Sequence, residues 1–480
     1  MQELRQTNHS DKDPDVLRYE QMEINDTEQY FDVESIENII EFYAENEQIE
    51  RAERVLNLGL KMHPDSLDLL IKKSYILIEK GEEKVAIQLL KKLLKFEETD
   101  PELYYNLAWA YLKAGNPKEA FVNFRNAINI AFDEYEVLIT DIAFTLNEFD
   151  QSDYAIELLE EAILKHPKNE LFLFELAYSF DKEDNTEKTI ATYNRLLEIN
   201  PFSELAWHNL AIIYNRIDDF QTALYCYDMA LAIKPDNAEA LFDKADLLID
   251  MNEFEKAFDC YIDSISYNFD YPLGYYQLAY CLEKMNNNEL ALRFYDLTIK
   301  IEPAFLLPWL NYISLLINTN NAKKALEKSM EAILISDMLP EFMYLRAKAH
   351  LIANEYQKAL TWFEKSVKDE PDNLRYIYEW FKVKKELFPK KDSFAILNEL
   401  RPRIASRAAL NYVSAAIALI EHKDFALAGS YLEFALIETP EEFQFFMDVF
   451  SFPESDILEN KYLFDIISKY IDFEISDISE

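Results

Sequence analysis

The chain has 480 residues but only five Gly, too few for the turns and phosphate loops of an ordinary α/β enzyme. Hydrophobic residues make up 50% of the chain, which is enough for a long core, and the composition favours an all-α protein. The formal net charge of −41 argues against general nucleic-acid binding and suits basic partners, although a solvated acidic exterior is the simpler explanation.

Residues 1–32 form an acidic, polar segment that we expect to be disordered. The opening sequence MQELRQTNHSDKDPD lacks the apolar stretch of a secretory signal, and no apolar run of about eighteen residues could span a membrane. Cys226, Cys260 and Cys281 are expected to be reduced core thiols. These features predict a cytoplasmic protein without membrane insertion.

Beyond residue 32 a small residue returns every 34 residues, with one extra residue between Ala120 and Ala155 and another between Ser393 and Ala428. The series consists of Ala52, Ala86, Ala120, Ala155, Thr189, Ala223, Ala257, Ala291, Ala325, Ala359, Ser393 and Ala428. A fixed period of this length predicts a stacked array of similar units, each of which contacts only its neighbours.

The unit at residues 204–237 shows what is repeated, with Glu204 taken as position 1. Two stretches have the i, i+3, i+4, i+7 spacing of an amphipathic helix. They contain Trp207, Leu210, Ala211 and Tyr214 at positions 4, 7, 8 and 11, and Ala223, Tyr227 and Ala230 at positions 20, 24 and 27. Pro235, at position 32, ends the second helix. Small residues at positions 8, 20 and 27 let two backbones approach closely, so each unit is predicted to be a helix hairpin.

This pattern resembles the tetratricopeptide repeat, whose signature W-x₂-L-x₃-Y…A-x₃-F/Y…P is carried here by Trp207, Leu210, Tyr214, Ala223, Tyr227 and Pro235. Units begin near residues 33, 67, 101, 136, 170, 204, 238, 272, 306, 340, 374 and 409, so the resemblance covers residues 33–442. It implies an all-α α-solenoid of about twelve helix-turn-helix repeats that form a right-handed superhelix.

Two regions depart from the pattern. Unit 374–408 is degenerate because Phe381 replaces the small residue at position 8 and Ser393 replaces the Ala at position 20, which predicts a bend or a local rearrangement. Residues 443–480 are predicted to form C-terminal capping helices and an acidic tail, because a terminal unit needs its open face covered. The alternative is a segment that competes for the binding groove.

The resemblance implies that the face of the first helix opposite the core, at positions 2, 5, 9, 12 and 13, lines a concave groove that holds an extended peptide. Aromatic residues at positions 5 and 9 either pack between neighbouring first helices or provide binding hot spots. Asn side chains at the adjoining position 6 either pair with a peptide backbone or are plain polar surface groups. The predicted partner-binding residues are Tyr105, Asn106, Trp109, Phe144, Phe174, Tyr178, His208, Asn209, Phe242, Asp246, Tyr276, Tyr280, Asn311 and Tyr344.

Charges on this face predict the character of the partner. Position 5 is never Lys, and no three successive units match the family's carboxylate clamp, so recognition of an acidic C-terminal tail is not expected. The middle of the face is instead acidic, which favours a basic or aromatic-rich peptide; its acids are Asp141, Glu175, Asp243, Asp246 and Asp250. Unit 374–408 has nine Lys or Arg against four Asp or Glu, hence a net charge of +5, and is either a solvated surface or a second interface.

The sequence contains no H-E-x-x-H motif, Cys/His ligand cluster, phosphate-binding loop or nucleophile elbow. We therefore expect no cofactor, no metal and no enzymatic activity. The predicted function is a noncatalytic protein–protein interaction scaffold or adaptor that binds a peptide or partner protein in its groove. The alternative is a self-regulated or homo-oligomeric assembly protein whose C-terminal segment occupies or caps the array.

Overall fold

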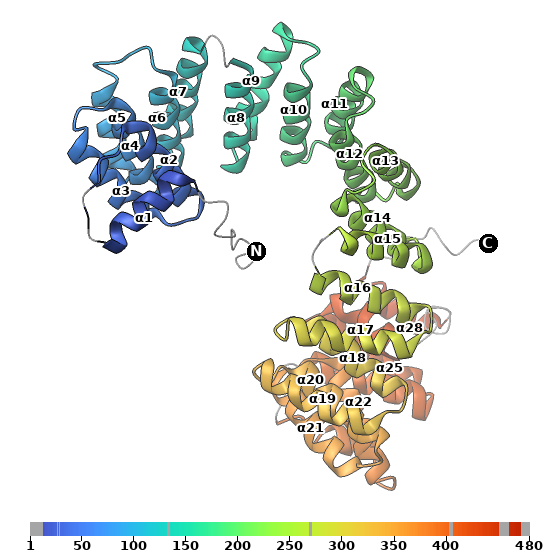
Figure 1. Ribbon diagram of the computed structural model, residues 1–480. Coiled ribbons are helices and arrows are strands. Elements are labelled where there is room, and N and C mark those ends of the chain that lie inside the picture. The colour runs from blue at the N-terminus through green and yellow to red at the C-terminus, as the bar shows by residue number, and fades with distance from the viewer. Residues whose placement is uncertain are drawn as a thin grey trace. The chain divides into compact units, whose positions relative to one another are not determined.

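The computed structural model describes residues 13–25, 27, 29–131, 135–267, 271–402, 407–450 and 460–471. Over these ranges the chain forms helices joined by short turns and contains no β-strand. It divides into two compact parts, Met1–Pro235 and Asp236–Glu480. In each part, consecutive helices pack as hairpins, which can be followed in chain order in Figure 1.

The N-terminal part begins with α1 (Pro14–Asn25) and continues as a series of hairpins. These are α2 (Val33–Glu45) with α3 (Ile49–Met62), α4 (Leu67–Glu79) with α5 (Glu83–Leu93), α6 (Pro101–Lys113) with α7 (Pro117–Ile130), α8 (Tyr135–Glu148) with α9 (Ser152–Lys165), α10 (Glu170–Lys182) with α11 (Thr186–Ile199), and α12 (Glu204–Arg216) with α13 (Phe220–Ile233).

The C-terminal part continues the series and ends with additional helices. Its hairpins are α14 (Ala238–Asp250) with α15 (Phe254–Ser266), α16 (Tyr271–Lys284) with α17 (Asn288–Ile301), α18 (Leu306–Asn318) with α19 (Ala322–Ile335), α20 (Pro340–Ile352) with α21 (Tyr356–Asp369), α22 (Leu374–Leu387) with α23 (Ser393–Leu397), and α24 (Ala408–Ile417) with α25 (Phe425–Glu438). The π-helix η1 (Ala418–His422) and the 3-10 helix η2 (Pro440–Glu442) flank α25, and α26 (Phe443–Phe450) and α28 (Lys461–Ile467) follow.

The first helix of every predicted unit begins within one residue of its predicted start. The residues that specify the hairpin are also buried as expected: Ala211 at position 8 and Ala223 at position 20 are 0% exposed. Because neither side chain extends past Cβ, the paired backbones approach closely, and Tyr227 at position 24 fills the remaining space with 1% exposure. The prediction of an all-α array of helix hairpins is confirmed.

The Trp at position 4 and the Pro at position 32 are linked by a hydrogen bond between successive hairpins. Trp207 Nε1 donates to the carbonyl of Pro201 at 2.9 Å, and Trp309 Nε1 donates to the carbonyl of Pro303 at 3.0 Å. A buried indole N–H needs a partner, and the Pro that ends one helix leaves its carbonyl available. These two signature positions therefore contribute to packing and to the polar interactions that join the repeats.

The turn inside almost every hairpin places position 15 in the left-handed backbone region. Gly81 (φ 76°) and Gly115 (φ 73°) adopt this conformation without a Cβ clash. Elsewhere the position is filled mainly by Asp or Asn, which tolerate the conformation best among other residues; these are Asp150, Asp184, Asp218, Asn252, Asn286, Asn320 and Asn354. The array therefore has few glycines because Asp and Asn supply most of its turns.

The repeat at 374–408 departs from the others as its sequence indicates. Its second helix, α23, has only five residues, and Phe388 at position 15 has φ −129° rather than a left-handed value. Phe381 lies at position 8 and is only 3% exposed. Because this ring takes the space that Ala leaves free elsewhere, a full second helix cannot approach α22 as closely as in other repeats.

Both ends of the array carry added helices. Residues 14–25 were expected to be disordered, but they form α1, whose Val16 and Tyr19 are buried against Phe31. These two apolar residues, three apart, are enough to anchor a short helix to the first hairpin. Residues 1–12, 26 and 28 of the predicted segment lie outside the described residues.

At the other end, α26 begins one period after residue 409 and therefore has the register of a further first helix. Phe446 is 0% exposed within it. The later helix α28 packs on α25, where a Cβ on Gly429 would lie 2.6 Å from Tyr462 Cε1. The predicted acidic tail falls largely at residues 472–480, outside the described residues.

Candidate partner-binding face

The first-helix face is defined here as positions 2, 5, 6, 9, 12 and 13 of the first helices. In the N-terminal part it contains a cavity of about 250 Å³ between α2, α4 and α6. The cavity is lined by Ile40, Glu41, Ala44, Glu45, Ile71, Lys72, Tyr75, Glu102 and Asn106. Of these, only Asn106 is among the predicted partner-binding residues. Ile40 is at the core position 8, and the remaining residues occupy face positions of three successive repeats, which is the signal that could have found them.

The predicted aromatic residues at position 5 lie against the second helix of their own hairpin. Their rings face the residue at position 24, with centroid distances of 5.0–6.0 Å for Tyr105–Phe124, Phe174–Tyr193, Phe242–Tyr261, Tyr276–Tyr295 and Tyr344–Phe363. The expectation that this face takes no part in packing within a hairpin is therefore wrong, because a long ring reaches across to the partner helix.

His208 follows the same arrangement, with its ring 5.8 Å from Tyr227. It is 4% exposed, and Phe242 is 5% exposed. These two predicted binding residues are therefore core residues whose side chains offer little surface to a partner.

Position 9 is more accessible. Phe144 is 52% exposed, and the half-buried Trp109 stacks on Tyr75 with ring centroids 5.2 Å apart. The ammonium groups of Lys182 and Lys284 lie over the rings of Tyr178 and Tyr280, at 5.6 Å and 5.1 Å from their centroids; the full set of predicted position 9 aromatics is Trp109, Phe144, Tyr178 and Tyr280. These rings form the part of the face that an incoming chain can touch.

Polar side chains on this face join successive repeats. Asn209 Nδ2 donates to the hydroxyl of Tyr193 at 2.9 Å, and Asn311 Nδ2 donates to the hydroxyls of Tyr276 at 3.1 Å and Tyr295 at 3.4 Å. Both Asn residues occupy position 6, and each reaches the position 24 tyrosine of the preceding repeat. Asn209 and Asn311 thus already use their amide groups to stabilise the array.

Two carboxylates in the middle of the face have perturbed protonation. Asp246 accepts hydrogen bonds from Tyr261 and, at 3.0 Å, from Gln277, while burial raises its pKa above the ordinary value. Burial and the nearby charge of Asp141 raise the pKa of Glu175 to about 7. Its Oε2 atom is buried and makes no hydrogen bond in the described structure.

Models of the tetratricopeptide repeat match residues 36–165, 172–203, 192–225, 238–271 and 274–305. The matched residues include the position 8, 20 and 24 side chains whose burial defines the hairpins. The chain belongs to the tetratricopeptide repeat family. No curated protein sequence matches it significantly.

Several solved structures are similar to parts of the chain. YrrB, a tetratricopeptide repeat protein with an unusual peptide-binding site, is 18% identical over 38% of this chain and 93% of its own, with a TM-score of 0.34. A tetratricopeptide repeat protein from Parabacteroides merdae is 18% identical over 49% of this chain and 93% of its own, with a TM-score of 0.38. PilW, a type IV pilus biogenesis factor, is 18% identical over 42% and 94%, with a TM-score of 0.36.

The tetratricopeptide array is covered on its first-helix face near the C-terminal end. Phe445 of α26 lines a cavity of about 230 Å³ together with Tyr344 and Arg375, and the Arg375 guanidinium lies 5.7 Å from the centre of its ring. Phe450 of the same helix packs against Tyr378, with ring centroids 4.4 Å apart. Part of the C-terminal segment therefore lies on the first-helix face of the repeats that contain Tyr344 and Tyr378. The equivalent positions around Asn106 line a cavity instead.

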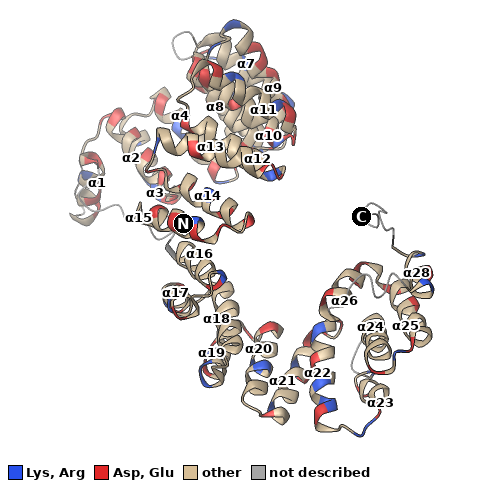
Figure 2. Cartoon of the chain, turned by 90° about the vertical axis from the view of Figure 1, so that its right-hand side faces the viewer, with Lys and Arg blue, Asp and Glu red and all other residues tan. Residues whose placement is uncertain are grey.

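The basic patch in repeat 374–408 is engaged in contacts within its own repeat. Lys382 Nζ lies 2.8 Å from Glu379, and Glu399 pairs with both Lys384 and Lys391. Figure 2 shows basic segments, in blue, and acidic segments, in red, interspersed along the ribbon of α22. Arg403 of the predicted patch lies outside the described residues. Much of the patch therefore stabilises a repeat that lacks a full second helix.

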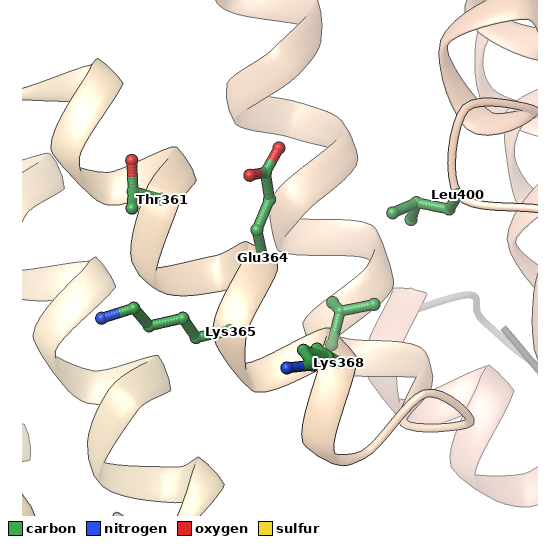
Figure 3. Close-up of a pocket in the computed structure, with 6 residues that line it drawn as sticks. Thr361, Glu364, Lys365, Lys368 and Leu400 are labelled. Carbon is green, nitrogen blue, oxygen red and sulfur yellow. The ribbon is translucent and has the colours of Figure 1, made fainter. Parts of the chain in front are cut away.

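A further cavity, of about 560 Å³, lies between α21 and the turn that carries Leu400. Figure 3 shows Thr361, Glu364, Lys365 and Lys368 projecting from the second helix of that tetratricopeptide hairpin. The cavity is therefore away from the first-helix face, and its mixed charges converge on no common point.

The described part of the chain contains no group of three or more His, Cys, Asp or Glu arranged to hold a metal ion. None of its helices is both long and apolar enough to cross a membrane. None of the three cysteines forms a disulfide in the described structure, and burial raises the pKa of Cys226 to about 11 and that of Cys281 to about 12. Thiols with such pKa values remain protonated near neutral pH and are poor nucleophiles.

Proposed function

We propose that this tetratricopeptide repeat protein is a noncatalytic interaction scaffold or adaptor that binds a peptide or a partner-protein segment along its first-helix face. The observation that carries the proposal is the cavity between α2, α4 and α6. A peptide that enters this cavity contacts three successive repeats. Each repeat can contact a different part of the peptide, so binding does not depend on one deep pocket. Repetition of one hairpin produces such an elongated surface.

Two further features support a partner of basic or aromatic-rich character. Phe144 is 52% exposed on the face, and exposed aromatic rings bury a large area at little conformational cost when a partner binds. Glu175 and Asp246 are half-buried and lie on the first-helix faces of the N-terminal part and of the C-terminal part, respectively. A positively charged segment on either face favours the ionised form of the carboxyl group that it meets.

A photo-crosslinking experiment tests this proposal. p-Benzoylphenylalanine replaces Phe144 on the first-helix face or, as a matched control, Leu164 on α9 of the same repeat, which is 85% exposed. The full-length protein is irradiated in extract of its native cells, and crosslinked proteins are identified by mass spectrometry. We expect discrete partner crosslinks at position 144 that are missing at position 164. The same products at both positions, or none at position 144, would contradict the proposal.

A second candidate function is self-regulation, favoured by the position of Phe445 beside Tyr344 on the first-helix face. If α26 restricts access, Phe445→Ala opens this part of the face. A crosslinking residue at position 344 should then capture a partner in the Phe445→Ala background and not in the otherwise unchanged protein. Identical crosslinks in both backgrounds would leave α26 with a capping role only.

We also propose a cytoplasmic location, because the described structure contains no disulfide and buries Cys226 and Cys281 as thiols, which fits a reducing compartment. Cell fractionation tests it. Recovery of the protein with an oxidising compartment would contradict this proposal.

A further inference from the structure

We propose that the cavity between α2, α4 and α6 receives a Lys or Arg side chain of an extended peptide, while the amide of Asn106 pairs with the peptide main chain beside it. The inference rests on the proposed function and specifies the chemistry of the partner. The volume of the cavity is about 250 Å³, which is smaller than the roughly 300–1,000 Å³ of a typical small-molecule site. A cavity of this size is suited to one long side chain.

Asn106 provides the first observation. The residue is 6% exposed and lines the cavity, and its amide makes no hydrogen bond with any residue that the structure describes. Because the amide is not fully enclosed by the described residues, it can pair with a group that enters the cavity. The amide offers both a donor and an acceptor, which an extended peptide backbone can satisfy together.

The reason for this unpaired amide is found in the preceding repeat. Asn209 and Asn311 occupy the same position 6, and each donates to a tyrosine hydroxyl at position 24 of the repeat before it. For Asn106 the corresponding residue is Leu90, which is 0% exposed and has no polar group. Asn106 therefore does not serve the structural purpose of the equivalent Asn residues and is left facing the cavity.

The charges of the lining provide the second observation. Glu41, Glu45 and Glu102 contribute three carboxylates, whereas Lys72 contributes one ammonium, so the lining has a net charge of −2. Lys72 Nζ is held 2.8 Å from Glu41. Glu45 and Glu102 make no ion pair with any described residue.

Those two carboxylates define what the cavity can accept. Lys72 acts electrostatically on Glu102 but is itself paired with Glu41, so the lining keeps a net negative charge. An incoming ammonium or guanidinium group is attracted by this charge, while an acidic side chain would be repelled. Tyr75 also lines the cavity, and its stacking on Trp109 fixes the ring there. The apolar stem of a Lys or Arg side chain can pack on this ring while its charged end reaches the carboxylates.

Binding of bead-bound heptapeptide pools by the full-length protein tests the inference. Each pool has one fixed central residue, Lys, Arg, norleucine or Glu, and randomised uncharged residues elsewhere. We expect the Lys and Arg pools to retain about tenfold more protein than the norleucine pool, and the Glu pool to retain least, because the lining is negative. The preference should weaken as salt is raised from low ionic strength.

Variants separate the two parts of the proposal. Glu45→Gln with Glu102→Gln should abolish the preference for Lys and Arg, whereas Asn106→Ala should weaken binding of all pools by a similar factor. The matched control is Glu160→Gln with Glu157→Gln on the outer side of α9, which should change nothing; circular dichroism checks that each variant is folded. An unchanged Lys and Arg preference in the first double variant overturns the inference.

The outcome also distinguishes this inference from the proposed function. If the four pools bind equally while the crosslinks at position 144 persist, the cavity is not a basic side-chain site but the scaffold function stands. If the crosslinks at position 144 are missing as well, both the proposed function and the inference about the cavity are wrong.

Discussion

The first-helix face is open near Asn106 and covered near Tyr344. At Asn106 the cavity is lined by first helices alone, and the charges around it are incompletely paired. At Tyr344 the equivalent surface is shared with α26, which brings Phe445 and Phe450 onto the face. The same helix positions thus serve as a binding surface or as a core wall, depending on whether another helix lies on them.

This difference bears on how aromatic residues on such a face are interpreted. Tyr75 stacks on Trp109 at the open site, and Tyr344 stacks on Tyr376 at the covered site, with centroid distances of 5.2 Å and 5.0 Å. The two pairs are alike in geometry, so aromatic character alone does not separate a binding surface from a packing surface. The unpaired polar groups around Asn106 do separate them.

The largest expected effect concerns the covered end. Phe446→Ala removes a ring that is 0% exposed and lies 5.3 Å from Tyr412, which should lower the stability of the C-terminal part by about 3–5 kcal/mol. Phe445→Ala, one residue earlier on the half-buried side of α26, should cost less than about 2 kcal/mol. Urea unfolding followed by circular dichroism measures both. Equal losses of stability in the two variants would show that the contacts of Phe445 on the first-helix face stabilise α26 as much as the core contacts of Phe446.

Glu175 tests the electrostatics of the open face through pH. Its pKa is raised from 4.5 to about 7, so the folded state binds more protons than the unfolded state between these values, and stability falls as pH rises through that window. Glu175→Gln should therefore stabilise the protein at pH 8 by roughly 1–2 kcal/mol, a figure reduced for solvent screening, and have little effect below pH 4.5.

Thermal unfolding of the Glu175→Gln variant at pH 5 and pH 8 checks this expectation. The matched control is Glu160→Gln, an exposed position on α9, which should show no such difference between the two pH values. A gain that is larger at pH 5 would have the wrong sign and would contradict the burial of the charged carboxylate as its cause.

The Asn residues at position 6 sharpen the comparison between bonded and unbonded groups. Asn209→Ala removes the hydrogen bond to Tyr193 and should cost about 1 kcal/mol, whereas Asn106→Ala removes no such bond and should be within about 0.5 kcal/mol of the unchanged protein. Chemical denaturation measures the free energy of unfolding of both variants. A substantial loss for Asn106→Ala would mean that its amide has a structural role.

The smallest expected effect is at the turns. Lys423 adopts φ 52° at position 15 of the last repeat, where most other repeats have Gly, Asp or Asn. Lys423→Gly should stabilise the protein by about 0.5–1 kcal/mol, because relief of the left-handed strain exceeds the added flexibility of the unfolded chain. Gly81→Ala should do the opposite, because φ 76° is strained for Ala. A shift in melting temperature checks both, and destabilisation by Lys423→Gly would contradict the strain argument.

Much of the fold could be predicted because its determinants are local and repeated. The spacing of Ala211 and Ala223 fixes where two helices can approach, and Pro235 fixes where the second one ends, so helix starts were predicted to within a residue. The weak repeat at 374–408 was equally visible, since Phe381 stands where a small side chain is required. The short helix α1 was missed because its few apolar residues lie in a polar segment.

The candidate site was predicted less well. The sequence pattern places positions 5 and 6 on or beside one helix face, but it could not show that Tyr276 packs on Tyr295 or that Asn311 bonds to both. Glu45 and Glu102 were not singled out, because one acidic residue among 89 Asp and Glu carries no individual signal. Their importance emerges only from their positions around one cavity.

The sequence by itself determined the repeating hairpin, its period and its family, because each depends on side-chain sizes at fixed spacing along one helix pair. Only the tertiary structure decided which polar groups are satisfied. Whether Asn106 is paired depends on Leu90 in the repeat before it, and whether the first-helix face is open depends on α26, which follows the array. Such interactions join residues of different repeats, so no single repeat's sequence specifies them.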